Sequence, residues 1–123
     1  MRHESIIKGQ RRKASFYYDE LNDLLHVYIN GKSVKTLVIG DITFDVDRHG
    51  KFIGVEIINA LDVLKPFSIT KEMLIDIKEA EIITEPVSQN TVYVAISLHI
   101  DEQEKQAFFS VEQFIVEKEA ALA

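Results

Sequence analysis

The sequence predicts a mainly β protein of the α+β class: an antiparallel β-meander of about seven or eight strands, with short helices near residues 60–75 and a C-terminal helix. Three observations support this prediction. Apolar and polar residues alternate with a two-residue period in several segments, which is typical of strands that bury one face. Short links rich in Gly, Asn and Asp separate these segments, as in turns. The chain has 123 residues, enough for one domain with its own core.

The composition excludes several classes of protein and of functional site. No apolar run approaches the roughly 20 residues that span a bilayer. No cysteine is present, so disulfides, thiolate metal sites and thiol nucleophiles are excluded. We expect one cytoplasmic domain over residues 1–123, with a basic arm over 1–13, a hairpin-rich core over 14–65, and additional helices and strands over 66–123.

The basic arm allows two interpretations. Residues 1–13 hold five Lys or Arg and one acidic residue, whereas the whole chain has a net charge of −6. The arm could bind nucleic acid through Arg11, Arg12 and Lys13, or it could pack against the protein's own acidic surface. Because an acidic body repels phosphates, the sequence favours the second interpretation.

Three strands are expected in the first third of the chain, over residues 14–20, 24–30 and 32–39. The first contains the aromatic cluster of residues 16–18, which favours strand. The second has His26 and Tyr28 on its more polar face. The pair Asn30-Gly31 is a strong hairpin signal, so Gly31 is predicted to join the second and third strands in a tight turn.

A central hairpin over residues 41–60 organises the predicted sheet. Its loop, Asp47–Gly50, ends in a glycine that can adopt a positive φ. A four-residue loop sets Val46 against Lys51, Phe44 against Ile53, and Ile42 against Val55, which keeps one face apolar. Gly54 is a further structural glycine, and two other residues of the return strand point away from the core face, namely Phe52 and Ile58.

The second half of the chain mixes helices and strands. One helical turn over residues 61–65 should end before Pro66, and Ser68 or Thr70 should cap a short helix over 71–74. Strands are predicted in the second half of 75–85, over 91–100 with unbroken alternation, and over 105–111. A last helix is expected over 112–121.

Several motifs in the first half resemble a small family known as domain of unknown function 2283. The resemblance covers about residues 14–65 and is carried by Tyr18-Asp19, Asp23, Leu25, Asp45-Val46-Asp47, Gly50 and Gly54-Val55-Glu56-Ile57-Ile58-Asn59-Ala60. His26 departs from the tyrosine usual in that family. The resemblance implies a hairpin-rich fold and a binding role, and it brings no established activity.

Acidic residues of the central hairpin are the candidates for a metal site. In the predicted register Asp41 lies opposite Glu56, with Asp45 two residues along. Three carboxylates at this spacing can hold Ca²⁺ or Mg²⁺, or divide acid and base roles in a hydrolase. The alternative is a solvated strand face that keeps the sheet soluble, and the sequence favours it. No catalytic residue, metal or cofactor is therefore predicted.

The four histidines are far apart in the sequence. His26 and His99 would meet only if their strands were neighbours, and two imidazoles are too few for a typical zinc site.

The sequence therefore predicts a non-catalytic module that binds a protein partner or associates with itself, most simply as a homodimer. The interface candidates are Tyr28, Phe52 and Ile58, which lie outside the predicted core face. A competing interpretation is that residues 78–111 fold over this patch as a second layer. The alternatives for function are the carboxylate-dependent site and nucleic-acid binding through the arm.

Overall fold

The computed structural model describes residues 7–112, which form eight strands and three short helical segments. The elements are β1 (Gln10–Asp19), β2 (Leu24–Tyr28), β3 (Lys35–Ile39), β4 (Ile42–Val46), β5 (Phe52–Ile58), α1 (Ala60–Leu64), the 3₁₀ turn η1 (Lys65–Phe67), α2 (Lys71–Ile75), β6 (Glu79–Pro86), β7 (Thr91–Ile100) and β8 (Gln103–Glu112).

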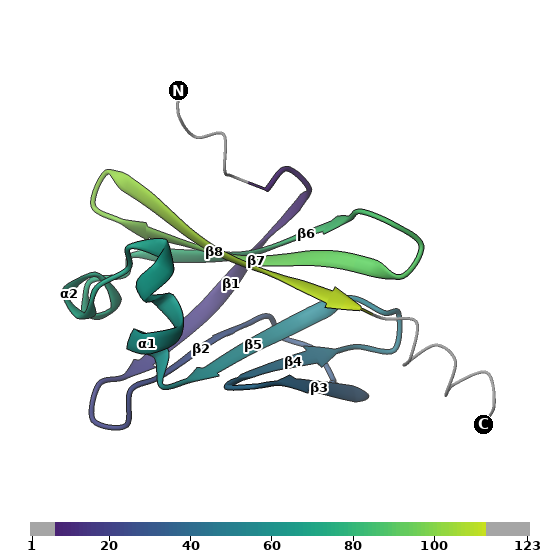
Figure 1. The fold of residues 1–123 in the computed structure, drawn as a ribbon, viewed down its shortest axis with the longest axis horizontal. Coiled ribbons are helices and arrows are strands. Elements are labelled where there is room, and N and C mark those ends of the chain that lie inside the picture. Colours follow the sequence, from purple (N-terminus) through teal and green to yellow (C-terminus); the bar gives the residue numbers. More distant parts are fainter. Residues whose placement is uncertain (1–6, 113–123) are drawn as a thin grey trace.

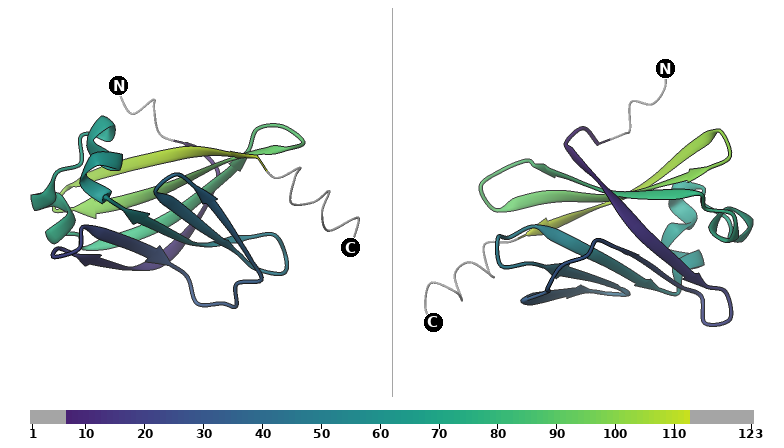
Figure 2. Two further views of the ribbon diagram at one scale, coloured as in Figure 1. Left: turned by 60° about the horizontal axis from the view of Figure 1, so that its bottom comes forward. Right: turned by 180° about the vertical axis from the view of Figure 1, so that it is seen from behind.

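All eight strands belong to one antiparallel sheet in the order β3-β4-β5-β2-β1-β6-β7-β8. The long strand β1 is shared by two halves: residues 15–19 pair with β2, and residues 10–14 pair with β6. The sheet bends along β1 into a half-barrel, so that the β1–β5 half and the β6–β8 half face each other (Figures 1 and 2). The helical segments lie at one end (Figure 1).

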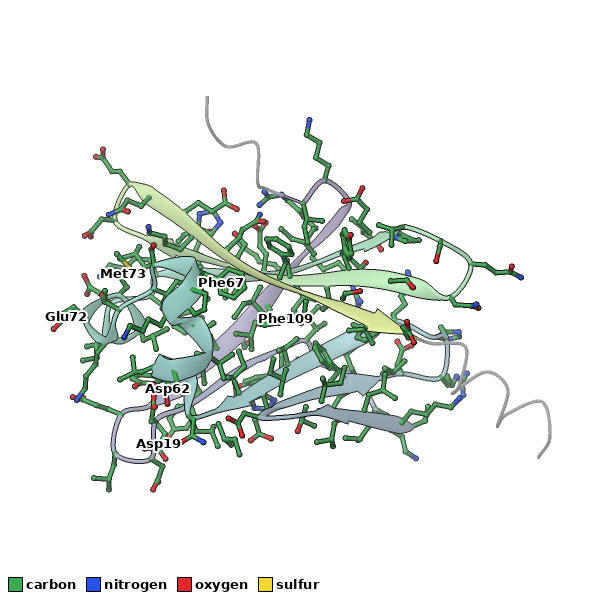
Figure 3. All side chains as sticks on the ribbon, in the orientation of Figure 1. Asp19, Asp62, Phe67, Glu72, Met73 and Phe109 are labelled. Carbon is green, nitrogen blue, oxygen red and sulfur yellow. The ribbon has the colours of Figure 1, made fainter. Side chains whose placement is uncertain are left out.

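Aromatic side chains join the two halves in the core. Phe44 of β4 is fully buried, and its ring lies 6.1 Å from that of Phe109 on β8 and 6.0 Å from that of Phe52 on β5. Phe67 of η1 closes the helical end, with its ring 5.9 Å from Phe109 (Figure 3). The contact between β4 and β8, which are distant in the strand order, shows that the inner faces pack together.

The strand order differs from the predicted meander, because β2 pairs with β5 and not with β3. The prediction of a hairpin at Asn30-Gly31 is therefore wrong: this segment crosses to the edge of the sheet. The physical reason lies in β5, where Phe52, Ile53, Val55 and Ile57 are all buried. A strand with this many buried residues belongs inside a sheet, whereas β3, which carries Lys35 and Thr36, tolerates the edge.

The central hairpin forms, but its predicted register is wrong by two residues. Phe44 pairs with Val55 and Ile42 with Ile57, and a β-bulge follows, after which Val46 pairs with Phe52. The bulge adds one residue to the return strand and turns Phe52 into the core.

The structural glycines have two different roles. Gly50 adopts a φ of 79°, as predicted, in a loop where Asp47 Oδ1 accepts hydrogen bonds from the backbone N–H groups of His49 and Lys51. Gly31 and Gly54 have no positive φ. They permit close approach, since a Cβ on Gly31 would lie 3.3 Å from Ile53 Cδ1.

The short helices near residues 60–75 are confirmed, and Thr70 caps α2 by accepting a hydrogen bond from the Met73 N–H. The predicted C-terminal helix starts at Glu112, which ends β8, and the remainder lies outside the described residues. None of the helices over residues 7–112 has the length and apolar character that a membrane span requires.

Candidate functional site

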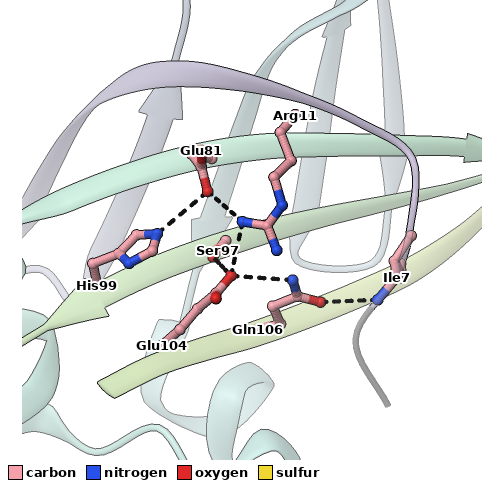
Figure 4. A network of polar contacts seen from close by, with 7 residues as sticks. All are labelled: Ile7, Arg11, Glu81, Ser97, His99, Glu104 and Gln106. Atoms are coloured by element: carbon pink, nitrogen blue, oxygen red, sulfur yellow. Dashed lines mark hydrogen bonds and ion pairs between the residues drawn. The ribbon is translucent and has the colours of Figure 1, made fainter. Parts of the chain in front are cut away.

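Polar side chains from four strands meet on the outer face of the β6–β8 half (Figure 4). The alternation of each strand places them there: His99 of β7 pairs with Glu104 of β8, and Ser97 of β7 pairs with both Glu81 of β6 and Gln106 of β8. Paired residues share a face of an antiparallel sheet. These five residues, with Arg11 of β1, are called the outer network below.

Arg11 is the central cation of the outer network. Its Nη1 lies 2.6 Å from Glu81 Oε1 and 3.0 Å from Glu104 Oε2. His99 Nε2 lies 3.3 Å from the same Glu81 oxygen. One guanidinium thus bridges two carboxylates from strands that are not adjacent, and it fastens β1 to the half-sheet.

Glu104 is the most highly hydrogen-bonded member of the outer network. Its Oε2 accepts hydrogen bonds from the hydroxyl of Ser97, which is fully buried, and from Gln106 Nε2 at 3.3 Å. Burial acts to raise the pKa of Glu104, but the hydrogen bonds from Ser97, Arg11 and Gln106 outweigh it and hold the pKa below its usual value. The carboxylate is therefore ionised at neutral pH.

Glu81, His99 and Glu104 are also the one group of three metal-ligating side chains that residues 7–112 bring together, with ligand atoms within 4.8 Å of one another. A divalent ion would have to displace Arg11 from both carboxylates. The site already holds a cation of the protein's own, so its geometry fits a structural role better than a metal centre.

The segment before β1 crosses the same face. Ile7 is buried against Ile83 and Ala95, and its N–H donates to Gln106 Oε1 at 3.2 Å. Gly9 permits this path, because a Cβ there would lie 2.1 Å from the Thr84 carbonyl oxygen. The outer network is thereby continuous with an apolar cover over the centre of the half-sheet.

The lowered pKa of Glu104 predicts a pH-dependent stability. The carboxylate stabilises the fold above its ordinary pKa of about 4.3, and this stabilisation is lost as the pH falls through the lower pKa of the folded state. Glu104→Gln is expected to cost about 1 kcal/mol at pH 7 and much less at pH 3, measured by urea unfolding. The exposed Glu102→Gln is the control. Parallel pH profiles for wild type and Glu104→Gln would contradict the assignment.

The predicted carboxylate site on the central hairpin does not assemble. Glu56 pairs with Thr43 rather than lying opposite Asp41. Asp41 is exposed, and its Oδ2 accepts a hydrogen bond from Asn59 Nδ2 at 3.4 Å. Asp45 instead accepts hydrogen bonds from the hydroxyl groups of Ser33 and Thr36. The two-residue error in register explains the difference.

The predicted interface residues are separated in the same way. Tyr28 is half-buried and Ile58 is 46% exposed, both on the outer face of the β1–β5 half. Phe52 is only 3% exposed and lies in the core, so the prediction that it points away from the core face is wrong. Phe52 instead agrees with the competing interpretation, in which residues 78–111 fold over it as a second layer and make it part of the core.

His26 and His99 do not meet, because β2 and β7 are not neighbours. The His26 ring lies 4.7 Å from that of Tyr28. In the basic arm, residues 10–13 belong to β1. Arg11 packs on the protein's own acidic residues, and Arg12 Nη1 donates to the Phe52 carbonyl oxygen at 3.4 Å.

A second polar cluster links the β1–β2 turn to α1. The Tyr18 hydroxyl donates to Asp23 Oδ1 at 2.8 Å, and the same carboxylate accepts from the Leu61 N–H at 3.2 Å. Asp23 therefore caps α1, whose own N-cap residue, Asn59, makes no side-chain cap. Burial, followed by the hydrogen bond to Asp23, raises the pKa of Tyr18 to about 12.

Sequence reasoning missed Glu81, Ser97 and Glu104. Alternation places them on the outer faces of their strands, and this signal was available. Their meeting depends on which strands are neighbours and in which register, and alternation carries no information on either.

Comparison with known proteins places the first half of the chain in context. Residues 15–60 match the family described as "Protein of unknown function (DUF2283)", which confirms the resemblance over the segment from β1 to the start of α1. The uncharacterized protein MJ0789 of Methanocaldococcus jannaschii is 49% identical over 49 residues, which are 39% of this chain and 42% of that protein. No solved structure matches the chain.

Proposed function

We propose that the chain is a non-catalytic interaction module that associates with a second copy of itself through the free edge of β3. The proposal rests on one observation, that one side of β3 has no strand paired with it among residues 7–112. β3 is the first strand of the sheet order and pairs with β4 alone among residues 7–112. Its unpaired N–H and C=O groups form a template for another strand.

The side chains of β3 favour pairing. Val38 is 68% exposed and Ile39 is 46% exposed. Natural edge strands are commonly blunted by charged side chains, Pro, a bulge or a covering element, and of these β3 has one charged residue, Lys35, at its first position. β3 has no Pro, and its register with β4 is regular. The other edge, β8, differs, since Phe67 of η1 packs against its aromatic residues.

Symmetry defines the register of the proposed dimer. Two copies of an antiparallel edge strand related by a twofold axis place Leu37 opposite Leu37 if all five residues pair. Thr36 then lies opposite Val38 of the second copy, and β-branched cross-strand pairs of this kind stabilise sheets. A contact of this size is small, so we expect dissociation at micromolar concentrations.

The polar clusters support a non-catalytic role. The carboxylates of Glu81 and Glu104 in the outer network accept hydrogen bonds from the Arg11 guanidinium. The Asp23 carboxylate accepts hydrogen bonds from the Tyr18 hydroxyl and the Leu61 N–H. Each of these carboxylates has partners within the protein, which supports a structural role for it.

Single-cysteine cross-linking tests the register. The chain has no cysteine, so Leu37→Cys introduces the single thiol. Directly opposite residues have Cα atoms about 4.5–5.5 Å apart, which suits a disulfide. Leu37→Cys is expected to form a covalent dimer on mild oxidation far faster than Val87→Cys, whose residue lies in the β6–β7 turn. Equal rates for the two variants would contradict the proposal.

A further inference from the structure

We infer that a hollow on the outer face of the β1–β5 half binds the guanidinium of an arginine on a partner protein. This recognition would be separate from self-association, since it uses the face of the sheet rather than the edge of β3. The hollow has a volume of about 200 Å³, and the residues that line it include His26, Tyr28, Gly31, Ser33 and Asp45.

Gly54 makes room for the side chain of Asp45, which lines the hollow. It pairs with Tyr28 of β2 on one side and with Asp45 of β4 on the other. Gly54 itself is buried and is not among the residues that line the hollow. A Cβ at this position would lie 3.0 Å from Asp45 Oδ2, so this carboxylate oxygen lies directly over the glycine.

Asp45 presents an oriented carboxylate to the hollow. Its Oδ1 accepts hydrogen bonds from Thr36 Oγ1 at 3.0 Å and from Ser33 Oγ at 3.3 Å. Within the part of the chain that the structure describes, Oδ2 has no hydrogen-bond partner and Asp45 has no ion pair. Asp45 lines the hollow, with one carboxylate oxygen held in place and the other available to accept a hydrogen bond.

The opposite wall is aromatic. The rings of His26 and Tyr28 lie 4.7 Å apart at an angle of 31°. A guanidinium plane can stack on an aromatic ring while its N–H groups donate to a carboxylate. His26, Tyr28 and Asp45 line the same hollow, so a guanidinium within it can contact a ring and the carboxylate together.

Charge complementarity indicates the partner. Two cross-strand rows of the outer face carry Asp45 and Glu56 and contain no Lys or Arg; they consist of Tyr17, His26, Glu56, Thr43 and Val38, and of Ser15, Tyr28, Gly54, Asp45 and Thr36. Lys13 lines the adjoining hollow beside Tyr28. The residues that line the hollow proposed here include one carboxylate, that of Asp45, and no Lys or Arg, so its charge complements a basic segment.

A titration followed by NMR tests the inference on the full chain. The probe is Nα-acetyl-L-arginine amide, and the corresponding citrulline compound is its uncharged analogue. The arginine probe is expected to shift the Gly54 amide resonance saturably. Asp45→Asn, which keeps an oxygen for Ser33 and Thr36, should weaken binding at least about tenfold. Asp41→Asn, on the exposed β3–β4 turn, should leave binding unchanged.

Three results would overturn the inference. These are the absence of a saturable shift at Gly54, an equal response to the citrulline compound, and equal binding by wild type and Asp45→Asn. Because the titration reports on Gly54, its outcome does not depend on whether β3 pairs with a second copy.

Discussion

Phe52→Asp is expected to lower the free energy of unfolding by more than about 3–5 kcal/mol, the usual cost of truncating a buried Phe. Phe52 is 3% exposed and packs edge-on against Phe44. The substitution removes this contact and places a carboxylate in an apolar core. A domain of this size has about 5–15 kcal/mol of stability in total. Thermal unfolding followed by circular dichroism measures the loss.

Ile58→Asp is the matched control for that experiment. Ile58 lies on the same strand, β5, and is 46% exposed, so we expect a loss of only about 1 kcal/mol. If the two variants were equally stable, the bulge that turns Phe52 inward would be contradicted.

Asp23→Ala is expected to cost about 2–4 kcal/mol. It removes the acceptor for the Tyr18 hydroxyl and for the Leu61 N–H, and hydrogen bonds to charged groups are among the stronger ones. Asp23 also has a φ of 53°, a left-handed conformation that costs Ala about 1–2 kcal/mol. Urea unfolding measures the change.

Asp23→Asn separates these contributions. Asn tolerates the left-handed region and keeps one acceptor oxygen, so we expect a loss of about 1 kcal/mol. The pKa of Tyr18 should fall below about 12 in both variants, which an alkaline absorbance titration detects. Equal losses for Ala and Asn would show that neither the backbone conformation nor the acceptor matters.

The strands could be predicted from the sequence because alternation is a local property. Residues 91–100 were predicted as one strand, and β7 has these bounds. Gly50 was predicted to adopt a positive φ and does so. The short helices could also be predicted, because Pro66 as a helix stop and Thr70 as a helix cap are local signals.

The pairing of the strands could not be predicted in this way. Alternation assigns Val27 to the core face, but it does not show that its partner is Val55. The bulge after Asp45 shifts the hairpin register and reverses the direction of Phe52. The outer network depends on both kinds of information, because Arg11 and Glu104 are 93 residues apart in the chain.

Of the predicted carboxylate site on the central hairpin, the sequence identified a residue with a distinct environment but not the role of that residue. Asp45 was identified as a candidate metal ligand, and the structure instead gives its carboxylate two hydroxyl donors and a position over Gly54. The residue type was a useful signal of an acidic surface. The register then determined which groups face the carboxylate.

The mass of the unmodified chain in solution tests self-association most directly. Light scattering after gel filtration, over rising concentration, is expected to show a mass that increases from 14.1 kDa toward twice that value. Val38→Lys, at a side chain 68% exposed on β3, should keep the fold and remain at 14.1 kDa. A wild-type mass of 14.1 kDa at high micromolar concentration would contradict pairing through β3.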